Sequence, residues 1–119
     1  MKYIKDRVRA GEVLFGTFIN LGAPLTAEIL GLAGYDWGLI DLEHGAGDEG
    51  NVLAQIQAME HTLTVPIVRI ESGSRPRFHR PLDFGAAGIM VPRVDSVEQG
   101  AKRSRDFTTH QNEHAGSHR

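Results

Sequence analysis

The alternation of four short apolar runs with segments of helical pattern limits the possible folds of this chain more than any other feature. The apolar runs are rich in β-branched residues and cover residues 13–19, 36–42, 65–70 and 87–92. Segments expected to be helical lie at 2–10, from 24 to Gly34, from about 52 to 61, at 75–84 and from Ser96 onward. Strands that alternate with helices in this way favour an α/β fold with a parallel sheet and right-handed crossovers.

Local signals support several of these boundaries. Pro24 suits the first turn of a helix, because its missing N–H has no partner there in any case. Gly34 is a typical helix end, and Ser96 followed by Gln99 has the spacing of a capping box. Pro81 falls inside the helix expected at 75–84 and should kink it.

Composition excludes several classes of protein. The chain has 119 residues, which is the size of one domain. It has 13 basic and 15 acidic residues and a net charge of -2, and this near balance argues against a nucleic-acid or membrane-surface binder. It has no cysteine, which excludes disulfides, thiol catalysis and cysteine-ligated metals. No apolar run approaches the roughly 20 residues of a membrane helix. Residues 1–10 are charged and lack a signal-peptide core, so we expect a cytoplasmic protein.

Polar and ionisable residues follow the ends of the expected strands. In order, they are Asn20, then Asp41, Glu43 and His44, then Arg69 and Glu71, and finally Arg93. In parallel α/β folds, functional sites form at the carboxyl ends of the strands. The sequence therefore predicts a site at this edge of the sheet.

Three of these residues suit proton transfer next to a carbonyl group. His44 has the residue type of a general base near neutral pH, and Asp41 is close enough in sequence to orient its imidazole. Arg69 offers a planar fork that matches a carboxylate. The alternative is structural: Asp41 and Arg69 form a buried salt bridge and His44 caps a loop. Asp83 alone is typical of a turn or cap, and no phosphate-binding glycine motif is present.

The last twelve residues, 108–119, break the pattern. They contain no Val, Ile, Leu, Met or aromatic residue. We interpret them as an unrelated, histidine-rich and disordered tail that follows a folded unit at 1–107. The alternative is a helical face formed by His110, His114 and His118 that binds a metal ion.

Three segments, at 36–45, 65–69 and 82–92, together resemble the 4-hydroxy-2-oxoheptanedioate aldolase family, which includes 2-keto-3-deoxy sugar-acid aldolases and belongs with the citrate lyase relatives. They read DWGLIDLEHG, VPIVR and LDFGAAGIMVP and stand in the family's order and spacing. The resemblance covers residues 3–107. It implies the N-terminal half of a (β/α)8 TIM barrel of the phosphoenolpyruvate/pyruvate-binding superfamily, since such barrels typically need roughly 250 residues.

The resemblance also implies an activity. Family members are metal-dependent carbon–carbon lyases, class II aldolases that cleave a 2-keto-3-deoxy or 4-hydroxy-2-oxo acid into pyruvate and an aldehyde. By resemblance, His44 is the base, Arg69 binds pyruvate or another 2-oxo acid, and Asp41 and Asp83 support the histidine and a water molecule. The divalent ion, Mg²⁺ or Mn²⁺, is held in the family by a Glu and an Asp on strands five and six, so no metal ligand is expected within this chain. The family commonly forms hexamers, which implies a homo-oligomer.

Three hypotheses follow for this chain. The first is a pyruvate aldolase in truncated form, because the family pattern stops at Phe107 as if after a frameshift or an early stop. The second is an inactive half-barrel that self-associates or binds a partner through its open edges. The third is a small flavodoxin-like binding domain. The aldehyde specificity of the family lies on later loops.

Overall fold

The computed structural model describes residues 3–116, which form four strands and five helices in alternation. The strands are β1 (Gly16–Ile19), β2 (Trp37–Asp41), β3 (Val65–Arg69) and β4 (Gly88–Met90). The helices are α1 (Lys5–Arg9), α2 (Pro24–Leu32), α3 (Glu49–Met59), α4 (Arg75–Asp83) and α5 (Val97–Gly116). The α/β class expected from the sequence is confirmed.

The strands form one parallel sheet in the order β1-β2-β3-β4. The register aligns Gly16 with Trp37 at one edge, and it aligns Asp41 with Arg69 and Arg69 with Met90 at the carboxyl ends. Within residues 3–116, β1 and β4 each have a neighbouring strand on one side only. The sheet is therefore open at both edges.

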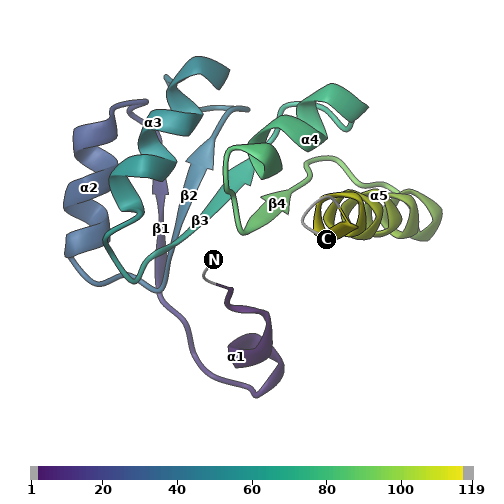
Figure 1. Ribbon diagram of the computed structural model, residues 1–119, viewed down its shortest axis with the longest axis horizontal. Helices are drawn as coiled ribbons and strands as arrows, with labels where there is room; N and C mark the ends of the chain where they lie inside the picture. Colours follow the sequence, from purple (N-terminus) through teal and green to yellow (C-terminus); the bar gives the residue numbers. More distant parts are fainter. Residues whose placement is uncertain (1–2, 117–119) are drawn as a thin grey trace.

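The core lies between one face of the sheet and the helices α2, α3 and α4 (Figure 1). Ile19, Ile40 and Val68 are aligned in register on that face and are at most 2% exposed. Side chains alternate between the two faces of a sheet, so Phe18 and Met90 lie on the opposite face, where they are 45% and 39% exposed. Only one face of the sheet is thus fully covered.

The first strand is shorter than the sequence predicts. Residues 13–15 are not part of a strand, and β1 begins at Gly16. A Cβ at Gly16 would lie 1.9 Å from the Trp37 ring, so only glycine fits there. Before that point, the Phe15 N–H donates to Asp36 Oδ2 (2.8 Å) and the Asp36 N–H donates to the Phe15 carbonyl (2.7 Å).

The helix boundaries have visible causes. Pro24 occupies the first turn of α2, as expected. Helix α3 begins with a capping box in which Asp48 and Asn51 each accept a hydrogen bond from the other's backbone N–H (3.1 Å each). Helix α4 runs through the buried Pro81 and ends two residues later.

The C-terminal segment corrects one prediction. Residues 108–116, expected to be disordered, continue α5 to Gly116. His110 is 6% exposed, and its Nε2 lies 3.0 Å from Asp83 Oδ1. Its ring lies against that of His79, with 4.6 Å between centroids and a tilt of 41° between the ring planes. The segment is ordered because it packs on α4, a tertiary contact that composition cannot reveal. The domain boundary at residue 107 stays a prediction.

The metal-binding alternative for this segment gains no support. Across residues 3–116, no group of three His, Asp or Glu side chains is placed to hold a metal ion. The side chain of His114 and all of His118 lie outside the described residues.

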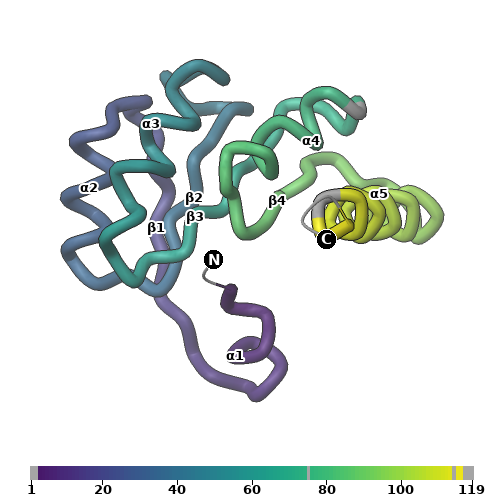
Figure 2. The backbone as a smooth tube through the Cα atoms, in the orientation of Figure 1, coloured from purple at the N-terminus to yellow at the C-terminus, as the bar shows by residue number. Residues whose placement is uncertain are grey.

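Helix α1 lies below the strands in Figures 1 and 2, and its residues Lys5 and Asp6 line one open pocket together with Leu82 of α4 and Phe107 of α5. It is joined to the sheet by Arg7, whose Nη1 lies 3.0 Å from Asp36 Oδ1. None of the helices within residues 3–116 combines the length and the apolar character needed to cross a membrane.

We predict that His110→Ala destabilises the fold by about 1 kcal/mol, because it removes a buried hydrogen-bonding side chain whose partner Asp83 is half exposed and can be solvated. Urea unfolding measures the free energy, and hydrogen exchange should become faster across residues 108–116. His61→Ala, at an exposed position, is the control. Equal stability of the two variants would contradict the docking of this segment.

Candidate active site

The centre of the candidate site is an ion pair between the last residues of β2 and β3. Because Asp41 and Arg69 are register partners, their side chains leave the same face of the sheet side by side. Arg69 donates from Nε to Asp41 Oδ1 (2.9 Å) and from Nη2 to Asp41 Oδ2 (2.5 Å). The Asp41 side chain is fully buried and that of Arg69 is 18% exposed. The structural alternative for this pair, a buried salt bridge, is therefore observed.

The same carboxylate also shapes the loop after β2. Asp41 Oδ1 accepts hydrogen bonds from the backbone N–H groups of Glu43 (2.9 Å) and His44 (3.2 Å). A Cβ at Gly45 would lie 2.2 Å from the Asp41 carbonyl oxygen, so the turn requires glycine. The Ala46 N–H then donates to the Asn20 carbonyl (2.7 Å), which ties the loop to the end of β1.

These contacts stabilise the charged form of Asp41. Hydrogen bonds from Arg69 lower the pKa of the Asp41 carboxyl to about 2, although burial opposes the shift, and the backbone N–H groups of His44 and Glu43 lower it further. The Asp41 hydrogen bond raises the pKa of Arg69 in return. Both groups are therefore charged throughout the neutral range.

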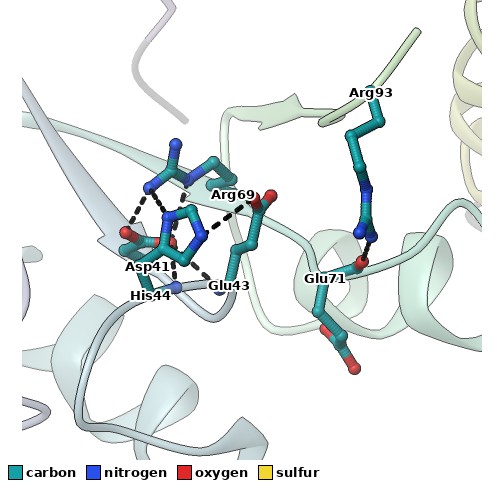
Figure 3. A network of polar contacts seen from close by, with 6 residues as sticks. All are labelled: Asp41, Glu43, His44, Arg69, Glu71 and Arg93. Atoms are coloured by element: carbon teal, nitrogen blue, oxygen red, sulfur yellow. Dashed lines mark hydrogen bonds and ion pairs between the residues drawn. The ribbon is translucent and has the colours of Figure 1, made fainter.

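His44 lies beside this pair and contacts two other side chains (Figure 3). Its Nδ1 is 3.2 Å from Arg69 Nη2 and its Nε2 is 3.3 Å from Glu43 Oε1. The ring is 68% exposed, so a ligand can reach it. Asp41, expected to orient the imidazole, holds the His44 backbone N–H, whereas the carboxylate beside the ring belongs to Glu43.

One end of Arg69 stays open for a ligand. Its Nε and Nη2 are engaged by Asp41 and His44, whereas Nη1 has no hydrogen-bond partner among the described residues. The guanidinium carbon lies 5.2 Å from the centre of the Phe18 ring, which covers one side of the cation. The arrangement offers two N–H donors to an anion next to the His44 imidazole.

Two other expected residues lie apart from this cluster, as Figure 3 shows. Arg93 Nη2 donates to the Glu71 carbonyl (2.8 Å), and Glu71 Oε1 lies 2.9 Å from Arg77 Nε. Arg93 adopts a positive φ of 54°, which is unusual for a residue with a side chain. These residues join the ends of β3 and β4 to α4. They do not contact the His44 imidazole, whose contacts are with Glu43 and Arg69.

The structure does not bring Asp83 to His44. Asp83 is the last residue of α4 and precedes β4, so it lies at the amino-end edge of the sheet, where it pairs with His110. His44 follows β2 at the carboxyl-end edge. The catalytic role that the resemblance implies for Asp83 stays a prediction.

The described residues of the site do not fit a divalent metal ion. Both Asp41 oxygens are used by Arg69, and Glu43 Oε1 faces His44. No third carboxylate or imidazole within residues 3–116 completes a coordination group with them.

The depressed pKa of Asp41 predicts a pH dependence of stability. A folded-state pKa of about 2, against the ordinary value of 3.8, adds about 2 kcal/mol that is complete above about pH 5 and is lost as the pH falls toward 2. Urea unfolding between pH 6 and pH 2 should show this loss in the wild type and not in Asp41→Asn. Asp95→Asn, at an exposed aspartate, should behave as the wild type does; parallel curves for all three proteins would refute the assignment.

Comparison with known proteins places this chain in a family. The HpcH/HpaI aldolase/citrate lyase family model matches residues 14–118. The chain is 38% identical over 104 residues to a hydroxypyruvate/pyruvate aldolase of Paraburkholderia phytofirmans, covering 86% of this chain and 40% of that protein. It is 38% identical over 95 residues to a 2-keto-3-deoxy-L-rhamnonate aldolase of Escherichia coli, covering 80% of this chain and 36% of that protein.

A solved structure shares the fold. An HpcH/HpaI aldolase/citrate lyase family protein of Burkholderia cenocepacia superposes with a TM-score of 0.82 at 35% identity, over 87% of this chain and 41% of that one. The four strand–helix units thus correspond to about half of a barrel, and the chain spans about two fifths of the length of these relatives. This chain belongs to the HpcH/HpaI aldolase/citrate lyase family.

Proposed function

We propose that this chain carries the substrate-binding and proton-transfer half of a carbon–carbon lyase that cleaves a 4-hydroxy-2-oxo or 2-keto-3-deoxy acid into pyruvate and an aldehyde. The observation that carries the proposal is the joint placement of the open Arg69 Nη1 and the His44 imidazole, held by the Asp41–Arg69 pair. Family membership supports an aldolase, and the relatives are named as aldolases of pyruvate and of a 2-keto-3-deoxy acid.

Each side chain has a distinct role in this proposal. Arg69 Nη1 donates to the carboxylate or the 2-oxo oxygen of the substrate and stabilises the enolate oxygen as negative charge develops. His44 takes the proton of the 4-hydroxyl group as the C3–C4 bond breaks and the aldehyde leaves. The protonated imidazole then returns this proton to C3 of the enolate, which gives pyruvate and restores the neutral ring. Asp41 fixes the orientation of Arg69.

The resemblance implies a divalent ion, Mg²⁺ or Mn²⁺. We propose that its carboxylate ligands come from outside these 119 residues, because the described side chains do not form such a site. A role for Asp83 in the reaction, a truncated form of a longer aldolase and a cytoplasmic location are further parts of this proposal.

An aldol-cleavage assay tests the function. With a 4-hydroxy-2-oxo acid, added Mn²⁺ or Mg²⁺ and the remaining strands of the barrel supplied as a second polypeptide that carries the metal ligands, we expect pyruvate release. It should fall at least 100-fold in His44→Ala and in Arg69→Ala, since each removes a group that acts in the transition state. Glu28→Gln on the exposed surface of α2 is the control. Release that survives in both site variants would overturn the assignment of these residues.

A second candidate function is self-association of a half-barrel. The outer edges of β1 and β4 lack a strand partner within residues 3–116, and α2 exposes an apolar stripe at helical spacing. Leu25, Ile29 and Leu32 of this stripe are 66%, 58% and 70% exposed. A second copy of the chain would supply four further strands, which is the number that an eight-stranded barrel needs.

The oligomeric state tests this candidate. We expect light scattering to give the mass of two or more chains, and Ile29→Lys to shift it toward one chain, because a charge in the stripe would be buried by the partner. Leu63→Lys, at an 89% exposed residue of the loop before β3, is the matched control. A wild type that is monomeric at all concentrations would exclude self-association.

A further inference from the structure

Glu43 stands out because its buried carboxylate has so few partners. Its side chain is 16% exposed, and Oε1 lies 3.3 Å from His44 Nε2. Its other oxygen, Oε2, is buried and makes no hydrogen bond within the described structure. Burial of a carboxylate without hydrogen-bond donors costs free energy. A proton on His44 Nε2 would therefore stabilise the buried Glu43 carboxylate by donating to it.

The neighbours of His44 together select one form of the neutral ring. A guanidinium group can only donate, so Arg69 Nη2, at 3.2 Å, requires a lone pair on Nδ1. A carboxylate can only accept, so Glu43 Oε1 requires the proton on Nε2. Both contacts therefore favour the Nε2–H tautomer.

We propose that Glu43 is a positioning residue that holds His44 in the Nε2–H tautomer and leaves Nδ1 as the atom that accepts the substrate proton. The role in catalysis rests on the proposed function, whereas the tautomer itself does not. When Nδ1 takes a proton, the ring becomes a cation with two donors. It then loses its contact with Arg69, and Glu43 stabilises the charge through Nε2–H.

Asp41 is excluded from this task by its own contacts. Both of its oxygens accept from Arg69, and Oδ1 also accepts two backbone N–H groups. The carboxylate that completes the acid–histidine pair is thus the residue directly before His44. The loop geometry makes this possible, because Asp41 fixes the backbone of both residues.

The test is the tautomer of His44, measured by long-range ¹⁵N–¹H correlation spectra of the whole chain at about pH 8.5, which is about two units above the ordinary imidazole pKa of about 6.5. We expect the Nε2–H form to dominate in the wild type. Its ratio to the Nδ1–H form should fall at least threefold in Glu43→Ala. It should fall less in Glu43→Gln, because the amide oxygen still accepts a hydrogen bond.

Glu71→Gln is the matched control, since Glu71 also has a buried oxygen without a partner but no contact with His44. A dominant Nδ1–H form in the wild type, or an unchanged ratio in both Glu43 variants, would overturn the proposal. If Glu43→Ala unfolds, as seen by circular dichroism, the isosteric Glu43→Gln decides.

The aldol-cleavage assay separates this inference from the proposed function. A lowered kcat with an unchanged KM in Glu43→Gln, together with the tautomer shift, would support the positioning role. If the tautomer shifts as expected but no pyruvate is released, the proposed function is contradicted. The assignment of the ring proton to Nε2 is then still supported.

Discussion

The ion pair between Asp41 and Arg69 is the interaction on which the rest of the site depends. It joins the ends of β2 and β3, and its carboxylate also accepts the two backbone N–H groups that set the course of the next loop. A buried ion pair compensates its desolvation only when its geometry and remaining hydrogen bonds are favourable, and every acceptor of this buried carboxylate is used. Removal of either partner would leave the other charge uncompensated.

The two sides of the Arg69 guanidinium group make different contacts because of this pair. The Nε side is fixed on Asp41 and Nη2 also reaches His44, while Nη1 remains open toward a ligand. A fixed arginine loses little freedom on binding an anion, which is the advantage of a preorganised site. The exposed His44 lies next to it, with Glu43 behind the ring. In the proposed function, anion recognition and proton transfer both depend on this edge of the sheet.

The open sheet gives the molecule its second constraint. The helices α2, α3 and α4 cover one face, whereas Phe18 and Met90 on the other face are partly exposed and both edge strands lack a second neighbour within residues 3–116. The relatives are longer, and this chain spans about two fifths of them. At the edge of the sheet where the strands begin, His110 of α5 packs on α4 and contacts Asp83.

The sequence by itself determined the element order, the parallel sheet, the family and the placement of Asp41, His44 and Arg69 at one edge. The element order, the sheet and the placement of these residues follow from periodicity, from β-branched strands and from residues that come directly after the strands, which are local properties of the chain. The family follows from the resemblance of three sequence segments. Tertiary structure decided which side chains touch. The carboxylate that contacts the His44 ring belongs to Glu43 and not to Asp41, because both Asp41 oxygens accept hydrogen bonds from Arg69. Tertiary structure also separated Asp83 from His44 and ordered residues 108–116 through the buried His110, because these depend on contacts between distant elements that no local pattern encodes.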